Sequence, residues 1–256
     1  MPSSTAIVTG ASQGIGRATA IRLARDFASL VLVARNRDHL LETADAVKAQ
    51  GAKALIIDLD LADKTAAKVV VEQTLAAFDR IDALLNIAGA VPQIDLFDMT
   101  DEQWDDGMAL KLHGARRLTI EAWPALKHAH GAVVFTSGNS AIFPKAPYAA
   151  VGTINAAIAA LAKAFADRGI DDGVQVNSVL PGPVMTGRRR SYLERWAPRH
   201  GMTVEEAMER FPREAGIARY GAAEEIAELM AFLVSPAARW MTGSMLRMDG
   251  GEVKSV

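Results

Sequence analysis

The chain of 256 residues suits one α/β domain, and half of its residues are hydrophobic, enough for a large core. A net charge of −2 argues against a general nucleic-acid or membrane-surface role, and the absence of cysteine excludes a disulfide framework and a thiolate metal site. The lack of cysteine fits a reducing compartment, so we expect a cytoplasmic protein. From the sequence we expect no leader peptide, no apolar run of membrane-spanning length and no metal site, since no His, Asp or Glu cluster has metal-ligand spacing.

Short apolar runs alternate with helical patterns along the chain. The runs expected as buried strands are residues 5–9, 30–34, 54–57, 83–87, 132–136, 174–179 and 244–248. The helical patterns cover residues 17–26, 38–50, 64–78, 101–126, 148–168 and 223–233. Near-continuous apolar runs are typical of parallel strands covered on both faces. We therefore predict a Rossmann-type, doubly wound parallel sheet flanked by helices, in a single domain over residues 1–256.

The first expected strand leads into a glycine-rich turn and a helix. Gly10 allows a tight exit from the strand, Gly14 lets a pyrophosphate approach the backbone, and Gly16 lets the helix pack close to the strand. The N–H groups and the dipole of the helix would then face the phosphate. The alternative is an ordinary surface turn. We assign to the cofactor site the turn residues Gly10, Ser12, Gln13, Gly14, Ile15 and Gly16.

The second expected strand ends in Ala34-Arg35. An acidic residue here typically accepts from the ribose hydroxyls of NAD, whereas an arginine suits the 2′-phosphate of NADP. Arg35 therefore favours NADP(H), with NAD(H) as the alternative cofactor. The competing interpretation is a solvated basic loop after a strand.

The spacing Gly-x-x-x-Gly-x-Gly after Thr9 resembles the short-chain dehydrogenase/reductase family. Further motifs extend the resemblance over nearly the whole chain: Asn86-Ile87-Ala88-Gly89, in which Ile87 replaces a second Asn, Pro181-Gly182-Pro183-Val184-Met185-Thr186, Arg219-Tyr220-Gly221 and Asp249-Gly250-Gly251. The resemblance implies an oxidoreductase that moves hydride between a nicotinamide and a carbonyl or secondary alcohol. It also implies that Asp60 and Leu61, rather than Asp58, contact the adenine, although Asp60 also reads as a strand-end or helix-capping carboxylate. The further cofactor contacts that it implies are Asn86, Ala88, Gly89, Tyr148, Pro181, Gly182, Val184 and Thr186.

The catalytic pattern of the family is incomplete here. The resemblance implies a Tyr as general acid/base, a Lys four residues later, a Ser that holds the substrate oxygen and an Asn on the preceding helix. Tyr148 stands in place, but Gly152 occupies the Lys position. Gapless counting from Gly131 puts Gly138 in the Ser position, between Ser137 and Ser140. The Asn position falls within residues 109–114, where Lys111 occupies it. Of the two serines we favour Ser137, because a modest loop shift would bring it into place, and keep Ser140 as the second candidate.

Two interpretations of these departures stay open. In the first, Lys111 supplies the missing cation from the opposite side, and Gly152 leaves room for it. In the second, the site has decayed into a nucleotide-binding protein without dehydrogenase activity, with a regulatory or structural role, and Lys111 is an ordinary surface lysine. Asn155 is interpreted as a packing residue or a subunit contact. His113 is interpreted as a structural histidine, with a place in the site beside Lys111 as the alternative.

A variable substrate lid is expected at about residues 186–213, rich in arginine. Such a lid would favour an acidic substrate or hold a cofactor phosphate, and the alternative is an exposed amphipathic helix pair. We expect a small-molecule substrate and no nucleic-acid or membrane partner. The resemblance implies a homotetramer or homodimer, and the apolar face over residues 154–165 fits such a contact.

Overall fold

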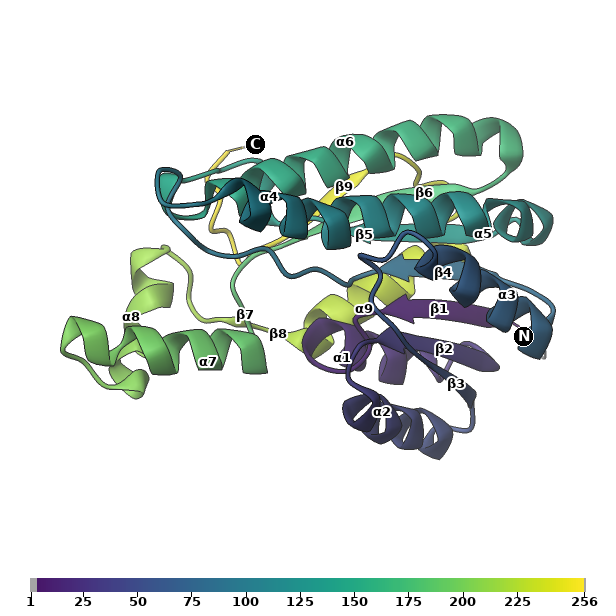
Figure 1. Ribbon diagram of the computed structural model, residues 1–256, viewed down its shortest axis with the longest axis horizontal. Coiled ribbons are helices and arrows are strands. Elements are labelled where there is room, and N and C mark those ends of the chain that lie inside the picture. Colours follow the sequence, from purple (N-terminus) through teal and green to yellow (C-terminus); the bar gives the residue numbers. More distant parts are fainter. Residues whose placement is uncertain (1–3, 256) are drawn as a thin grey trace.

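Residues 4–255 are described by the computed structural model, in which seven parallel strands form one sheet (Figure 1). The strands are β1 (Thr5–Thr9), β2 (Ser29–Ala34), β3 (Lys53–Asp58), β4 (Ala83–Asn86), β5 (Ala132–Thr136), β6 (Gln175–Pro181) and β9 (Met245–Met248). Their spatial order is β3-β2-β1-β4-β5-β6-β9. The expected strands are thus all present, with ends that differ by at most two residues. The order reverses between β1 and β4, and ligands bind such sheets at this switch point.

Helices cover both faces of the sheet. One layer contains α1 (Gly14–Leu23), α2 (Arg37–Ala49) and α9 (Ala223–Leu233), and the other contains α3 (Ala66–Phe78), α5 (Ala115–Ala129) and α6 (Ala149–Asp172). Successive side chains of β2 point to opposite faces, so Leu30 and Leu32 join the first core while Val31 and Val33 join the second. This double burial explains the continuous apolar strands and confirms the predicted doubly wound architecture.

The segment predicted as one helix over residues 101–126 has three parts. It begins as α4 (Asp101–Gly107), continues as the π-helical segment η1 (Met108–Gly114) and ends as α5. An added Cβ at Gly114 would lie 2.8 Å from the carbonyl oxygen of Leu61, so the glycine permits a close approach to the end of β3. π-Helical turns occur often at functional sites, and this one carries Lys111.

The longest helical segment, Ala146–Asp172, is by length and composition able to cross a membrane, which corrects the expectation that no such run exists. Its apolar side chains have another use in this fold. Ile158, Ala162 and Ala166 are buried in the core under the sheet, and Ala150 and Ile154 pack with Val91. A core helix that lies against strands needs the same composition.

The lid region is helical and stands to one side of the sheet (Figure 1). Two short strands, β7 (Val184–Met185) and β8 (Gly221–Ala222), pair and frame α7 (Gly187–Trp196) and α8 (Val204–Glu214). Leu193, Ala197 and Ala207 form a small core between the two helices. The lid is therefore a packed helix pair, and α7 begins directly beside the ligand-binding edge of the sheet.

Candidate active site

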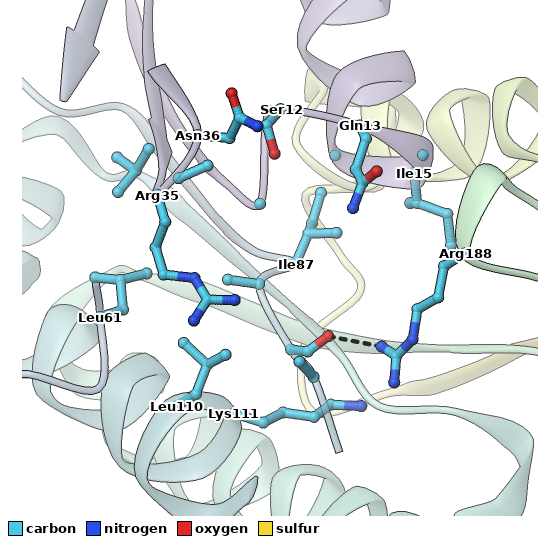
Figure 2. A pocket seen from close by; sticks show the side chains of 18 of the residues that line it. Ser12, Gln13, Ile15, Arg35, Asn36, Leu61, Ile87, Leu110, Lys111 and Arg188 are labelled. Atoms are coloured by element: carbon cyan, nitrogen blue, oxygen red, sulfur yellow. Dashed lines mark hydrogen bonds between the residues drawn. The ribbon is translucent and has the colours of Figure 1, made fainter. Parts of the chain in front are cut away.

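A cavity of about 560 Å³ lies at the carboxyl ends of β1, β2 and β4. Its size is in the range of cofactor and small-molecule sites. Figure 2 shows side chains of its lining from both sides of the switch point. The cavity is lined by Gly10, Ser12, Gln13, Gly14, Ile15, Gly16, Val33, Ala34, Arg35, Asn36, His39, Leu59, Asp60, Leu61, Ile87, Ala88, Gly89, Ala90, Leu110, Lys111, Thr136, Thr186 and Arg188.

The glycine-rich turn forms one wall of the cavity. Gly10 and Gly14 have φ of 68° and 56°, a left-handed conformation that favours glycine. An added Cβ at Gly16 would lie 2.1 Å from the carbonyl oxygen of Gly10, so the helix can start only with glycine there. The N-cap residue Gln13 makes no side-chain hydrogen bond to α1, which leaves the first N–H groups of the helix for a ligand. These features fit a pyrophosphate.

Arg35, Asp60 and Leu61, which were expected to contact the adenosine part of the cofactor, all line the cavity. Nη1 of Arg35 lies 3.4 Å from Oδ2 of Asp60, and the arginine side chain is 66% exposed. Asp58, in contrast, pairs with Arg37 at 2.7 Å and does not line the cavity. A cation follows β2 where a carboxylate would repel a 2′-phosphate, so the residues present fit NADP(H).

The expected cofactor residues at the other end divide into two groups. Ala88, Gly89 and Thr186 line the cavity. The residues that lie outside its lining are Asn86, Tyr148, Pro181, Gly182 and Val184.

The strand connection at β4 is made by a residue that the sequence did not single out. The Oγ1 of Thr9 accepts hydrogen bonds from the backbone N–H groups of Ile87 and Ala88, at 2.8 and 3.0 Å. Asn86 points instead to α5, where its Nδ2 donates to Thr119 at 3.0 Å. The side chain of Asn86 therefore contacts a helix and not a neighbouring strand.

Lys111 reaches into the cavity from η1. Its Nζ donates to the carbonyl oxygen of Ser137 at 3.2 Å and makes a short hydrogen bond to Oδ1 of Asn155. Burial, and secondarily the positive charge of Arg188, lowers the pKa of Lys111 from 10.5 to about 8. An added Cβ at Gly89 would lie 2.9 Å from Cδ of Lys111, so the glycine makes space for the lysine stem. Lys111 is therefore not an ordinary surface lysine.

The space at Gly152 is not what lets Lys111 enter. An added Cβ there would lie 2.9 Å from Cβ of Pro144 and 3.0 Å from the carbonyl oxygen of Ser140. The loop before α6 has thus closed over this position, whereas Lys111 lies against Gly89 and Asn155. This corrects the idea that Gly152 leaves room for Lys111.

Asn155 joins the residues around Lys111, a role that the sequence interpretation missed. It is 3% exposed, its Nδ2 donates to Oγ of Ser140 at 2.8 Å, and its carbonyl oxygen accepts from Oγ of Ser137 at 2.7 Å. The helical spacing of Tyr148, Gly152 and Asn155 was the available signal, because residues three, four and seven apart share one helix face. Tyr148 itself is partly buried at the junction between the turn η3 (Ala146–Tyr148) and α6.

The lid contributes one arginine to the cavity. Arg188 donates from Nη1 to the carbonyl oxygen of Gly89 at 3.1 Å and from Nη2 to that of Val91 at 2.9 Å. Figure 2 shows its side chain and that of Lys111 reaching the same part of the cavity. Arg189 lies instead among the rings of Tyr192, Phe211 and Tyr220, at 5.1–5.5 Å from the ring centroids.

Two other expectations concern His113 and metals. His113 is half-buried on η1, lies outside the cavity lining, and its Nδ1 has no hydrogen-bond partner among the residues that the structure describes. Within residues 4–255, no three His, Asp or Glu side chains are grouped so as to hold a metal ion.

Comparisons with known proteins agree with this geometry. The model of a family described as enoyl-(acyl carrier protein) reductase matches residues 10–252. An uncharacterized oxidoreductase, YvaG, of Bacillus subtilis (strain 168) is 31% identical, over 98% of this chain and 97% of that protein. The short-chain reductase NovJ of Streptomyces niveus is also 31% identical, over 97% of this chain and 93% of that protein.

A solved structure of a reductase has the same fold. The L-sorbose reductase of Gluconobacter frateurii, complexed with NADPH and L-sorbose, superposes with a TM-score of 0.94 at 29% identity, over 100% of both chains. The fold, the glycine-rich turn and the relatives agree, and the chain belongs to the short-chain dehydrogenase/reductase family.

Proposed function

We propose that this protein is an NADP(H)-dependent oxidoreductase that transfers hydride between the nicotinamide and a carbonyl or secondary alcohol. The observation that carries the proposal is the place of Lys111. Position 152 has no side chain, yet an ammonium group lies in the cavity, held by Ser137 and Asn155. We infer that Lys111, on η1, supplies the cation that the chemistry needs.

The cofactor site is the cavity at the switch point. Gly10, Gly14 and the N-terminus of α1 would hold the pyrophosphate, and Arg35 the 2′-phosphate. Asp60 and Leu61 would flank the adenine. Bound NADPH supplies the hydride for carbonyl reduction. The NADPH complexes of the sorbose reductase and of an actinorhodin polyketide ketoreductase support this choice of cofactor.

The protein's own residues handle the proton. Tyr148 would donate it from its hydroxyl to the substrate oxygen during reduction and take it back during oxidation. An ammonium near the Tyr148 hydroxyl would favour the phenolate that is left behind, and this is the role that we propose for Lys111. A hydroxyl donor would hold the substrate oxygen, and here the geometry favours Ser140 over the Ser137 that the sequence favoured, because Ser137 already donates its hydrogen to the carbonyl of Asn155.

A nucleotide-binding protein without hydride chemistry is the second candidate. Gly152 favours it, since Pro144 and the carbonyl of Ser140 fill the space beside this position. The two candidates differ in turnover and agree in binding, so one set of assays separates them.

The test is a fluorescence titration with NADPH, followed by a panel of ketones and aldehydes with NADPH absorbance as the readout. L-sorbose, 3-oxoacyl thioesters and cyclic diketones belong in the panel, because the relatives include reductases of sorbose, 3-oxoacyl-[acyl-carrier-protein] and levodione. We expect turnover that the Tyr148→Phe variant loses, with NADPH affinity retained. Tight NADPH binding without turnover across the panel would instead establish the second candidate.

A homodimer or homotetramer is part of the proposal. The apolar face over residues 154–165, which was expected to make the subunit contact, faces the core instead, with Ile154, Ile158 and Ala162 at most 2% exposed. Other apolar side chains of α5 and α6 are exposed, with Ile120 50% and Ile170 69% exposed. Exposed apolar residues on neighbouring helices are typical of contacts between subunits. Sedimentation analysis should give a mass of two or four chains, and a monomer at micromolar concentration would contradict this assembly.

A further inference from the structure

Three segments of the candidate active site meet at one buried side chain. Asn155 of α6 contacts Lys111 of η1, Ser137 at the end of β5, and Ser140 of the turn η2 (Asn139–Ala141). Its amide has an acceptor end and a donor end, and each end is used by a different candidate catalytic residue.

The charge of Lys111 fixes which way the amide points. An ammonium group has donors only, so it must face the oxygen Oδ1 of Asn155. The nitrogen Nδ2 then faces Oγ of Ser140 and donates to it at 2.8 Å. Because the hydroxyl oxygen of Ser140 accepts this bond, its own hydrogen is left to be donated elsewhere.

The neighbouring glycine is explained by the same amide. An added Cβ at Gly138 would lie 2.5 Å from Nδ2 of Asn155, nearer than a Cβ atom approaches its neighbours. The φ of Gly138 is 163°, an extended conformation that any residue adopts, so the backbone itself does not require glycine. The amide of Asn155 therefore occupies the space of a side chain at position 138, where gapless counting places the serine of the family.

We propose that Asn155 is a positioning residue, which holds the ammonium of Lys111 in the cofactor cavity and orients the hydroxyl of Ser140 as a hydrogen-bond donor toward the substrate oxygen. The inference rests on the proposed function for its use in catalysis. Its structural part, the hold of Asn155 on Lys111, is testable without a substrate.

The first test measures the titration of Lys111 by NMR on protein with 13C-labelled lysine, the signal being assigned from its loss in Lys111→Met. The Asn155→Asp variant keeps the shape of the side chain at position 155 and places a carboxylate against the ammonium of Lys111. An opposite charge at this distance should raise the pKa of Lys111 by about 1 to 3 pH units. Arg188 is the charged group that acts on Lys111 in the native protein, and it is unchanged in the variant.

Asn177→Asp is the matched control. Asn177 is equally buried, but its amide contacts the carbonyl of Met241 and the N–H of Ser244, at 2.7 and 3.0 Å. This variant introduces a buried carboxylate on β6, next to α6 in the chain, and its amide position makes no hydrogen bond to Lys111. We expect the pKa of Lys111 to be the same in this control variant as in the native protein. The inference would be overturned if Asn155→Asp shifted the pKa of Lys111 no more than Asn177→Asp does.

The second test uses an isosteric apolar variant, Asn155→Leu, with the best substrate from the panel. We expect kcat to fall at least about 10-fold, because Lys111 loses one of two partners and Ser140 loses its orienting donor, whereas Kd for NADPH changes less than about threefold. Asn155 does not line the cavity, so equal losses in kcat and in NADPH affinity would overturn the inference.

The two tests separate the inference from the proposed function. If the native protein turns over no substrate but Asn155→Asp raises the pKa of Lys111, the hold on Lys111 stands and the proposed function fails. If turnover is found and the titration of Lys111 does not move, the inference fails alone.

Discussion

Gly138→Ala is the substitution whose effect follows most directly from the structure. The added methyl group would lie 2.5 Å from Nδ2 of Asn155, so the amide has to move. Overpacking of this kind costs about 1–3 kcal/mol, and the displaced amide also loses its bond to Ser140, at about 1 kcal/mol. Alanine also restricts the unfolded chain more than glycine does, which stabilises the folded protein by about 0.4–1 kcal/mol. We therefore expect a net destabilisation of about 1–3 kcal/mol.

The assay is a double-mutant cycle by urea unfolding. In the background Asn155→Ala, the same Gly138→Ala substitution meets no amide, so it should be neutral or slightly stabilising. The coupling energy between the two positions is expected to be about 1–3 kcal/mol, well above the scatter of about 0.5 kcal/mol for independent sites. Additive effects within that scatter would refute the reasoning.

Gly187→Ala provides the control for stability. An added Cβ at Gly187 has nothing within 4 Å, and the residue is the first of α7. Alanine is a better helix former than glycine, so this variant should be neutral or stabilising in both backgrounds. A loss of stability there comparable to that of Gly138→Ala would show that the effect is not specific to Asn155.

Three further predictions concern charged groups. Burial lowers the pKa of Lys111 to about 8, so the rate of carbonyl reduction should fall as the pH rises through about 8. The Lys111→Met variant should have a lower kcat, and its rate should no longer show this fall. An unchanged pH profile in the variant would contradict the role of Lys111. The Arg35→Asp variant should bind NADPH more weakly relative to NADH by about 10- to 100-fold in calorimetric titrations, because it loses charge-assisted hydrogen bonds worth about 1.5–3 kcal/mol. An unaltered ratio of the two affinities would show that Arg35 does not bind the 2′-phosphate. Hydrogen bonds from Lys127, then from Trp123 and Arg168, hold the pKa of Asp172 well below its usual range. The stability that Asp172 contributes is therefore present above the pKa of an unfolded Asp, about 3.9, and is lost as the pH falls below that value. The Asp172→Asn variant should have a lower urea midpoint at pH 7 and a flatter decline of this midpoint below about pH 4, and a decline as steep as in the native protein would contradict this.

The sheet and the cofactor turn were predictable because their determinants are local. The apolar runs of β1 and β5 match the observed strands residue for residue, since a strand buried on both faces needs apolar residues without interruption. Gly10 and Gly14 are required by their own backbone angles, and a backbone requirement shows in the sequence as a glycine.

The hydrogen-bond network around Lys111 was only partly predictable because it depends on contacts between distant segments. The position of Lys111 on the helix before β5 indicated a replaced cation, but its partner Asn155 lies 44 residues further along the chain. Nothing in the sequence distinguishes the hydrogen-bond direction of Ser137 from that of Ser140. Their roles separate only when the donor and the acceptor of each bond are known.

Two elements escaped prediction for other reasons. The π-helical segment η1 has the same apolar pattern as the α-helices that flank it, and periodicity in a short segment does not separate the two. The lid helix α8 had a readable start in Thr203 and Glu206, which form a capping box in the structure. That signal identifies a helix but not its contacts, and so the lid arginine that enters the cavity, Arg188, could not be chosen from the sequence.

The account depends most on Lys111 being the cation of the active site, and a crystal structure with NADP+ bound tests this most directly. The distances to measure join Nζ of Lys111 to the hydroxyl oxygen of Tyr148 and to the oxygens of the nicotinamide ribose. We predict that Nζ lies within about 3 Å of one of these oxygens, or reaches it through one ordered water. A Lys111 side chain turned to solvent, with no cation near Tyr148, would contradict the account and leave a nucleotide-binding protein without hydride chemistry.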